Sequence, residues 1–112
     1  RVVDPVLGVQ VPHVLPTLRA LAEQFPTSPD AMAAFNRLGE LYSDLDQYER
    51  AAQVWTALGT KFPNNPYDAW FRAGEIYERR LKDMEKARAA YEKVAAGTGR
   101  YRDAQKKLSR QP

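Results

Sequence analysis

The sequence has no cysteine, a single histidine and no long apolar run. Without cysteine the chain has no disulfide, no thiolate metal ligand and no cysteine nucleophile. Asp4 and Asp30 are the aspartates nearest to His13 in the sequence, and a lone histidine does not supply the ligand set of a usual zinc site. A membrane helix needs about 20 consecutive apolar residues, so no membrane span is expected.

The motifs that accompany catalysis are also missing. The three serines, Ser28, Ser43 and Ser109, stand at expected helix ends, and none lies in a G-x-S-x-G nucleophile elbow. The sequence GTG at 97–99 is too short for a phosphate-binding loop and follows a helix rather than a strand. The sequence therefore predicts a protein that is not an enzyme, with no cofactor and no catalytic, cofactor-binding or metal-binding residue.

The composition fits one folded domain of 112 residues, of which 44% are apolar and 28% charged. The sequence begins with Arg1 rather than Met and has no signal-peptide pattern, so we expect a fragment of a longer protein. Residues 1–56 have four basic and seven acidic residues (−3), whereas residues 57–112 have thirteen and seven (+6). Such a charge dipole can orient a charged partner, although a solvated helical surface can have the same composition.

A short sequence repeats along the chain. FPTSP at 25–29 recurs as FPNNP at 62–66, 37 residues later, and each copy lies between two stretches with helical apolar spacing. Ser28 and Asn65 are predicted N-caps, followed by a proline at the first helical position, and Asp46 with Glu49 predicts a capping box. The predicted helices are 13–25, 29–44, 47–61, 66–81, 84–96 and 101–110.

The N-terminal residues are rich in valine, but Pro5, Gly8 and Pro12 interrupt them. We therefore expect residues 1–12 to form an extended segment rather than a sheet, followed by a helical domain at 13–112. Residues 2–11 have six apolar side chains and one charge, that of Asp4. We expect this segment to pack on the first helix or on a neighbouring chain.

Two sets of residues at fixed spacing carry a resemblance to a known family. The first set is Phe35, Leu38, Gly39, Tyr42, Ala51, Trp55, Leu58 and Pro63, and the second is Trp70, Ala73, Gly74, Tyr77, Ala87, Tyr91 and Val94. The pattern resembles the tetratricopeptide repeat, which pairs two helices in about 34 residues. The first set departs from it at Leu58, where a small residue is usual, and the second ends at Gly97 instead of proline.

The resemblance implies an all-α, right-handed solenoid of antiparallel helix pairs with about two and a half repeats. The repeats would lie at about 29–63 and 66–99, with partial repeats at 13–26 and 100–110. Gly39 and Gly74 fall inside predicted helices, where glycine costs roughly 1 kcal/mol relative to alanine. Close approach of the paired helix would explain both, with Ala51 and Ala87 as the small residues that face them.

The resemblance also implies a protein–protein interaction scaffold whose concave groove is lined by the first helix of each pair. The implied groove residues are Ala33, Asn36, Arg37, Glu40, Asp44, Asp68, Phe71, Arg72, Glu75, Arg79, Lys106, Lys107 and Arg110. The carboxylate clamp of some relatives begins with lysine and then asparagine four residues later; here Asn36 and Glu40 hold those positions. The groove is instead expected to suit a peptide or helix with acidic and apolar groups. Phe71 would either stack on the ligand or be partly buried against a neighbouring helix.

Two other functions stay open at this point. The terminal helix could join two copies of the chain in a homodimer, or the basic end could bind nucleic acid. The basic residues concerned are Arg100, Arg102, Lys106, Lys107 and Arg110, with Tyr101 among them. Nucleic acid is the least favoured partner, because the net charge is only +3.

The connection Phe-Pro-x-x-Pro is similar to that of bacterial envelope members of the family, including the Tol-Pal coordinator and outer-membrane assembly lipoproteins. It implies a location in the periplasm or cell envelope, with the cytoplasm as the alternative.

Overall fold

The computed structural model describes residues 1–24 and 27–110, and its principal extents are 43 × 28 × 17 Å. Its elements are two short strands, β1 (Val2–Val3) and β2 (Gln10–Val11), and six helices within the described residues. The helices are α1 (Val14–Gln24), α2 (Pro29–Asp44), α3 (Tyr48–Lys61), α4 (Ala69–Arg79), α5 (Met84–Glu92) and α6 (Tyr101–Arg110). The prediction that the first helix includes residue 25 lies outside the described residues.

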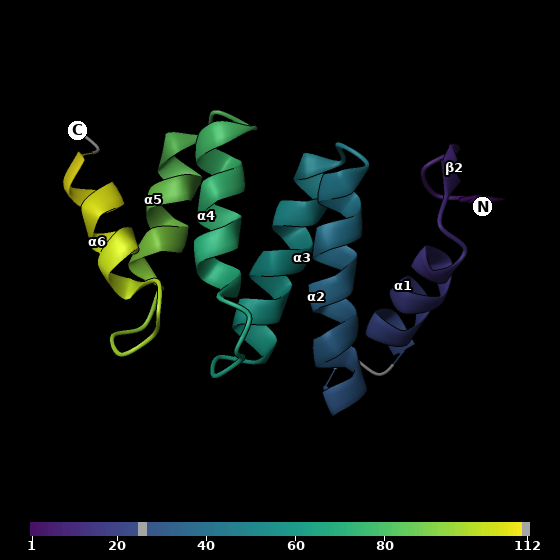
Figure 1. Ribbon diagram of the computed structural model, residues 1–112, viewed down its shortest axis with the longest axis horizontal. Helices are drawn as coiled ribbons and strands as arrows, with labels where there is room; N and C mark the ends of the chain where they lie inside the picture. The colour runs from purple at the N-terminus through teal and green to yellow at the C-terminus, as the bar shows by residue number, and fades with distance from the viewer. Residues whose placement is uncertain (25–26, 111–112) are drawn as a thin grey trace.

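Each helix packs against the next one along the chain, from α1 to α6, so that the helices stand in a row (Figure 1). Short connections force consecutive helices to run antiparallel. The helices α2 and α4 lie on one side of the row, and α3 lies behind them. The predicted all-α solenoid of antiparallel helix pairs is therefore confirmed.

The starts of α2 and α4 differ, although the sequences before them are similar. Ser28 caps α2 as predicted: its hydroxyl accepts a hydrogen bond from the backbone N–H of Ala31 at 3.1 Å. The prediction that α4 begins at Pro66 is wrong. The Asn65 amide accepts from the N–H of Tyr67 at 2.9 Å and donates to the carbonyl of Phe62 at 2.8 Å. This turn delays α4 to Ala69.

The start of α3 and the end of α5 also differ from the prediction. The capping box of Asp46 and Glu49 does not form, because α3 begins at Tyr48 and Gln47, at the N-cap, makes no side-chain capping bond. Asp46 instead has a positive φ of 58°, and its carboxylate accepts a hydrogen bond from the Tyr48 hydroxyl at 2.8 Å. Helix α5 ends at Glu92, four residues before the predicted end.

Each helix pair is locked by an aromatic ring that lies over a glycine. A Cβ added to Gly39 would collide with the indole ring of Trp55, and one added to Gly74 would lie 2.5 Å from the ring of Tyr91. The close approach predicted at both glycines is confirmed, but the facing groups are these rings rather than alanines. Gly59 has the same relation to Trp70, and this contact, which was not predicted, joins α3 to α4.

The N-terminal segment differs from the expected extended segment. Val2 pairs with Val11 and Val3 with Gln10 in an antiparallel hairpin. The Asp4 carboxylate is fully buried, where it accepts hydrogen bonds from the N–H groups of residues 6 and 7. These hydrogen bonds hold the turn that follows Asp4, so that the chain reverses between β1 and β2.

Asp4 also ties this hairpin to the helices. The guanidinium of Arg19, on α1, donates to both carboxylate oxygens of Asp4 at 2.8 and 2.9 Å, and its Nε donates to the hydroxyl of Tyr42 on α2 at 2.9 Å. The hydrogen bonds from Arg19 lower the pKa of Asp4 despite its burial, and the same bonds raise the pKa of Arg19. The ion pair of Asp4 and Arg19 therefore fixes the hairpin to α1, and the hydrogen bond from Arg19 to Tyr42 links it to α2.

Candidate partner-binding face

Most of the predicted groove residues of α2 and α4 share one face, which we call the α2–α4 face; they are Arg37, Glu40, Asp44, Arg72, Glu75 and Arg79. Glu40 of α2 lies 3.6 Å from the guanidinium of Arg37 and 3.9 Å from that of Arg72 on α4. Arg79 lies 3.7 Å from Glu75, one turn earlier on α4. These pairs are long and their side chains largely exposed, so each contributes about 0–1 kcal/mol to stability. The charges are accessible to a ligand.

Arg72 has a second, tighter contact. Its guanidinium carbon lies 4.6 Å from the centre of a ring of Trp55, the residue whose indole covers Gly39. A guanidinium stacked on an indole in this way is held in place by the ring's electron density. Yet 42% of the Arg72 side chain stays exposed. The stacking therefore orients the side chain while leaving its edge open to solvent.

A pocket of about 350 Å³ lies between the end of α2 and the outer side of α4. We call it the arginine pocket; its lining residues are Ser43, Asp44, Tyr48, Arg72, Glu75, Ile76, Arg79 and Arg80. Four predicted groove residues are thus brought together, namely Asp44, Arg72, Glu75 and Arg79.

The other four lining residues, Ser43, Tyr48, Ile76 and Arg80, are absent from the sequence prediction. The Arg80 guanidinium carbon lies 5.0 Å from the centre of the Tyr48 ring. The adjacent basic pair at 79–80 was a signal in the sequence. The prediction placed both residues inside the helix, because its predicted end at 81 is two residues too late; α4 ends at Arg79.

Phe71 does not lie on an open face. Its side chain is only 4% exposed, and its ring centre lies 5.6 Å from that of Tyr91 on α5. The Arg100 guanidinium, just before α6, covers the ring at 5.2 Å from its centre. Of the two expectations for Phe71, the structure agrees with burial against a neighbouring helix and not with stacking on a ligand, because the chain entering α6 closes over this position.

The basic residues of α6 do not act as one group. The Lys107 ammonium donates to the Glu78 carboxylate of α4 at 3.0 Å, and the Tyr91 hydroxyl donates to the same oxygen at 2.6 Å. Burial tends to raise the pKa of Glu78, but these two donors outweigh it and lower the pKa; burial and Glu78 together raise the pKa of Tyr91. Lys107 thus joins α6 to α4, whereas Lys106 and Arg110 remain exposed.

Two other predicted residues lie apart from the arginine pocket. Asp68 holds the left-handed position before α4, with a φ of 55°, and lines a small cavity beside Trp70. The Oδ1 atom of Asn36 is buried and has no hydrogen-bond partner among residues 1–24 and 27–110. Neither residue is in the lining of the arginine pocket.

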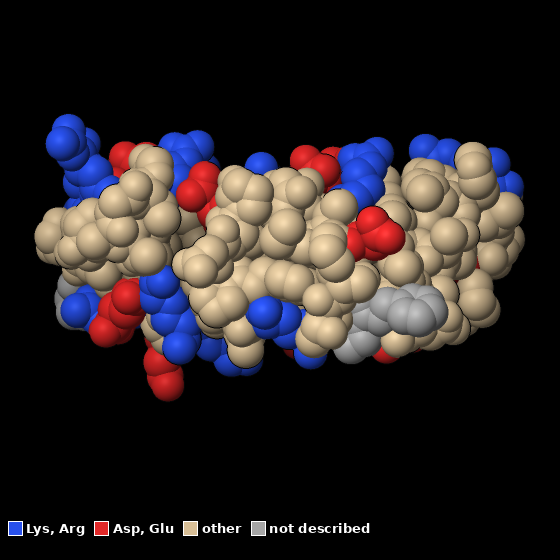
Figure 2. All heavy atoms as spheres, turned by 90° about the horizontal axis from the view of Figure 1, so that it is seen from below, with Lys and Arg blue, Asp and Glu red and all other residues tan. Residues whose placement is uncertain are grey.

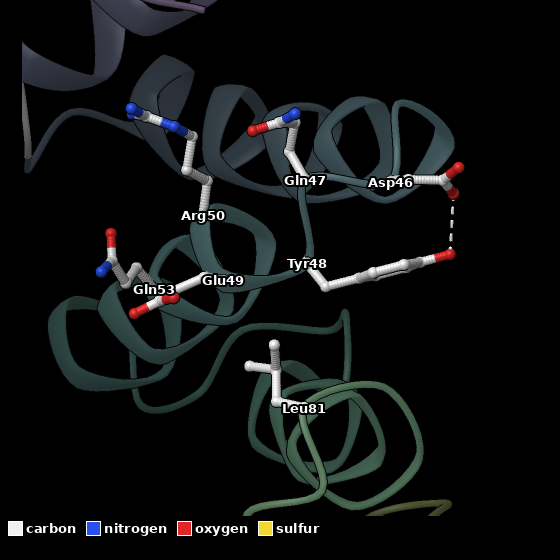
Figure 3. A pocket seen from close by; sticks show the side chains of 7 residues that line it. All are labelled: Asp46, Gln47, Tyr48, Glu49, Arg50, Gln53 and Leu81. Atoms are coloured by element: carbon white, nitrogen blue, oxygen red, sulfur yellow. Dashed lines mark hydrogen bonds between the residues drawn. The ribbon is translucent and has the colours of Figure 1, made fainter.

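A second pocket, of about 490 Å³, lies at the turn between α2 and α3 (Figure 3). Its side chains diverge: Arg50 and Gln47 point away from Leu81, and Tyr48 extends to the other side, toward Asp46. The hydrogen bond to the Asp46 carboxylate raises the pKa of the Tyr48 hydroxyl. Diverging groups of this kind do not converge on a reacting atom as a catalytic site requires.

The charge distribution weighs against a nucleic-acid track on the face seen in Figure 2. There, basic side chains lie beside acidic ones near the margins, and uncharged atoms occupy the middle. A nucleic-acid site needs a continuous basic stripe. The part of the chain that the structure describes also has no group of three or more histidine, cysteine, aspartate or glutamate residues that could hold a metal ion. No described helix is long and apolar enough to cross a membrane.

The positions of the two repeats agree with a family model. The model of the tetratricopeptide repeat matches residues 30–65 and 68–96. The chain belongs to the tetratricopeptide repeat family. No curated protein and no solved structure matches the chain significantly. Tetratricopeptide repeats are generally protein–protein interaction modules and typically non-enzymatic scaffolds, which makes the α2–α4 face the candidate site for a protein partner.

Proposed function

We propose that the α2–α4 face is a concave groove that binds a peptide or helix of a partner protein, and that the chain acts by binding rather than by catalysis. The observation that carries the proposal is the arginine pocket, in which Arg72, Arg79 and Arg80 surround about 350 Å³ of open space. The ligand would present a carboxylate and an apolar side chain.

The contacts of the arginines support an acidic ligand. Arg72 and Arg79 reach their carboxylate partners only at 3.9 and 3.7 Å, which is longer than a charge-assisted hydrogen bond. Their N–H donors can therefore bind an incoming carboxylate bidentately without first breaking a strong internal pair.

The floor of the arginine pocket supports an apolar contact beside the carboxylate. Ile76 is 9% exposed and belongs to the core that joins α3 and α4. A ligand methyl or aromatic group placed there would be removed from water beside the charged rim. Such a mixed site selects a ligand that has both kinds of group.

The test begins with a random-peptide library selected on the purified 112-residue chain. We expect the enriched peptides to combine acidic and apolar residues, and to lose at least about tenfold in affinity when Arg72→Ala and Arg79→Ala are combined. The matched control combines Lys82→Ala and Arg102→Ala, two exposed basic residues outside this face. The melting midpoint of the control variant should stay near that of the wild type, whereas the Arg72/Arg79 variant should melt a few degrees lower, because it loses the stacking of Arg72 on Trp55.

The same measurements separate the alternatives. Full affinity in the Arg72/Arg79 double variant, together with loss of affinity on neutralising Lys106 and Arg110, would move the site to α6 and refute the groove. Dimerisation through α6 would appear as self-association of the chain without any peptide. Its apolar side chains at 104 and 108 already pack toward α5 and α4, which favours the groove.

We further propose an envelope location, supported by the repeated Phe-Pro-x-x-Pro connection at 25–29 and 62–66. Fractionation of the source cells, followed with an antibody against this domain, tests it. We expect the signal in the periplasmic or membrane fraction. A signal confined to the cytoplasmic fraction would refute the location and leave the groove unaffected.

A further inference from the structure

The two repeats place opposite charges at equivalent positions of the arginine pocket. Gly39 and Gly74, the glycines under the aromatic rings, are thirty-five residues apart. By the same offset Asp44 of α2 corresponds to Arg79 of α4. Each is the last residue of its helix, and both line the arginine pocket. One helix therefore ends at this pocket in an acid and the other in a base.

Two neighbouring pairs of positions on the α2–α4 face have the same charge in both repeats. By the same offset Arg37 corresponds to Arg72, and Glu40 corresponds to Glu75. In each helix the arginine precedes the glutamate by three residues, so that the two lie on one side of the helix. The charge changes sign only at the next position of this row, where each helix ends. The difference therefore belongs to this pair of positions and not to the repeat as a whole.

Asp44 lies where it does not stabilise its own helix. The C-terminal end of a helix has a partial negative charge, so that a base is favourable there and an acid is unfavourable. The last turn of α2 has no basic residue to compensate. The Asp44 carboxylate is exposed, and it forms no ion pair and accepts no hydrogen bond in the part of the chain that the structure describes. No contact within the fold therefore accounts for an acid at this position.

Arg80 gives the other side of the pocket an oriented positive charge. It follows the last residue of α4, and its guanidinium carbon lies 5.0 Å from the centre of the Tyr48 ring. The Tyr48 hydroxyl donates to the Asp46 carboxylate at 2.8 Å, which holds the ring in place (Figure 3). Arg80 forms no ion pair with an acid of residues 1–24 and 27–110. The pocket thus has one unpaired acid on α2 and one unpaired base at the end of α4.

We propose that the arginine pocket selects a peptide that has a basic group as well as an acidic one, and that Asp44 is the residue that determines this specificity. The proposal rests on the proposed function and names its ligand more closely. The basic group of the peptide pairs with Asp44, and its acidic group pairs with Arg79 and Arg80. The peptide therefore crosses from α2 to α4 in one orientation. The reverse orientation would place its acid against Asp44 and its base against the arginines.

The probe is an array of immobilised peptides of about seven residues, which in extended form span about 23–25 Å, or two helix diameters. Each peptide has leucine at its centre and lysine, glutamate, glutamine or alanine at every other position. The ends are acetylated and amidated, so that terminal charges take no part in binding. We expect the fluorescently labelled protein to bind best the peptides that have lysine on one side of the leucine and glutamate on the other.

A double-mutant cycle assigns the basic group of the peptide to Asp44. The tightest peptide is compared, by fluorescence anisotropy, with its copy in which glutamine replaces lysine. We expect the wild type to prefer the lysine peptide about three- to fivefold, and Asp44→Asn to bind both equally. Asp44→Lys should instead prefer a copy with glutamate at that position. The control, Glu85→Gln, removes an exposed acid outside the pocket and should keep the wild-type preference.

Thermal melts of the same variants separate binding from stability. Asp44→Asn should melt slightly above the wild type, because α2 loses an acid from its C-terminal end. The substitution would then weaken binding of the lysine peptide while it stabilises the fold, which a purely structural role does not allow. A lower melting midpoint for Asp44→Asn would show that the acid supports the fold and would overturn the proposal.

The failure of this proposal is distinguishable from that of the proposed function. If no glutamate peptide binds, or if the Arg72/Arg79 double variant binds them as the wild type does, both are refuted. If the glutamate peptides need Arg72 and Arg79 but bind equally well with lysine or glutamine, only the basic group of the ligand is refuted. A lysine preference that persists in Asp44→Asn would likewise overturn the role of Asp44 and leave the groove in place.

Discussion

The two ends of the solenoid are each fastened by an ion pair, but at different depths. At the N-terminal end Arg19 contacts Asp4 at 2.8 Å, and the Asp4 side chain is fully buried. At the C-terminal end Lys107 contacts Glu78 at 3.0 Å, while the two side chains keep 16% and 24% of their exposure. The distances are similar, and so is the exposure of the two cations, at 14% for Arg19 and 16% for Lys107. The carboxylates differ, because Asp4 is fully buried and Glu78 is 24% exposed.

Both pairs also involve a tyrosine of a repeat. Arg19 donates to the Tyr42 hydroxyl, and Glu78 accepts from the Tyr91 hydroxyl. The difference in burial decides what each contact contributes. A buried charge that loses its partner is strongly unfavourable, whereas water screens a partly exposed one. We therefore expect the N-terminal hairpin to be coupled to the whole fold and α6 to be coupled mainly to its neighbours.

The strongest test of this difference is Arg19→Met, which keeps an apolar stem and removes the charge. It leaves the Asp4 carboxylate buried without its partner, and we expect the free energy of unfolding to fall by about 3–5 kcal/mol. Urea denaturation followed by circular dichroism measures it. Adding Asp4→Asn to this variant should recover part of the loss, since no unpaired charge would remain. A loss below about 1 kcal/mol would show the pair to be solvated.

The second test concerns pH at the same end. Asp4→Asn should cost roughly 1.5–3 kcal/mol at neutral pH, because hydrogen bonds to a charged group are lost. The pKa of Asp4 is lowered in the folded state from its ordinary value of 3.8. The contribution of its charge is therefore fully present above about pH 4 and declines as the pH falls through the lowered pKa.

The gap in stability between wild type and Asp4→Asn should accordingly stay constant from pH 8 to pH 5 and shrink in stronger acid. Denaturation curves of both proteins across that range measure the gap. A gap that widened on acidification would contradict the lowered pKa.

The third test compares the middle of the two repeats. Gly39→Ala and Gly74→Ala each place a Cβ against a ring, that of Trp55 or that of Tyr91. Overpacking costs typically about 1–3 kcal/mol, less up to about 1 kcal/mol regained from helix propensity. Gly99→Ala is the control, because nothing lies within 4 Å of its added Cβ. Thermal melts in which all three variants match the wild type would refute the glycine–aromatic locks.

The sequence predicts the repeated part of this fold better than its ends. The spacing of Phe35, Tyr42 and Trp55 follows helical periodicity, so their burial can be inferred from the chain itself. The contact of Asp4 with Arg19 joins residues fifteen positions apart across a hairpin, and no local pattern indicates it. The late start of α4 depends on the turn chemistry of Asn65, which resembles a helix cap in the sequence alone.

The candidate site was predictable to a similar degree. Arg72 and Arg79 follow from the repeat register, because seven residues are nearly two helical turns. Phe71 was also predicted to line the groove and is nevertheless buried, because Arg100 and Tyr91 close over it. Whether a groove position is open depends on the next helix, and that information lies about thirty residues away in the chain.

The smallest expected effect belongs to the C-terminal pair, and it decides whether the two ends differ. Lys107→Met removes the charge facing Glu78 and keeps the apolar stem. Glu78 retains its hydrogen bond from the Tyr91 hydroxyl and partial contact with water, so we expect a loss of only about 0.2–1 kcal/mol. Lys106→Met, on the exposed side of α6, is the control and should be near neutral. Hydrogen exchange should quicken in α6 and remain unchanged in α1 and α2, because only the last helix loosens. A loss as large as that of Arg19→Met would mean that the partly exposed pair holds the whole fold as the buried one does, and burial would no longer explain the difference between the ends.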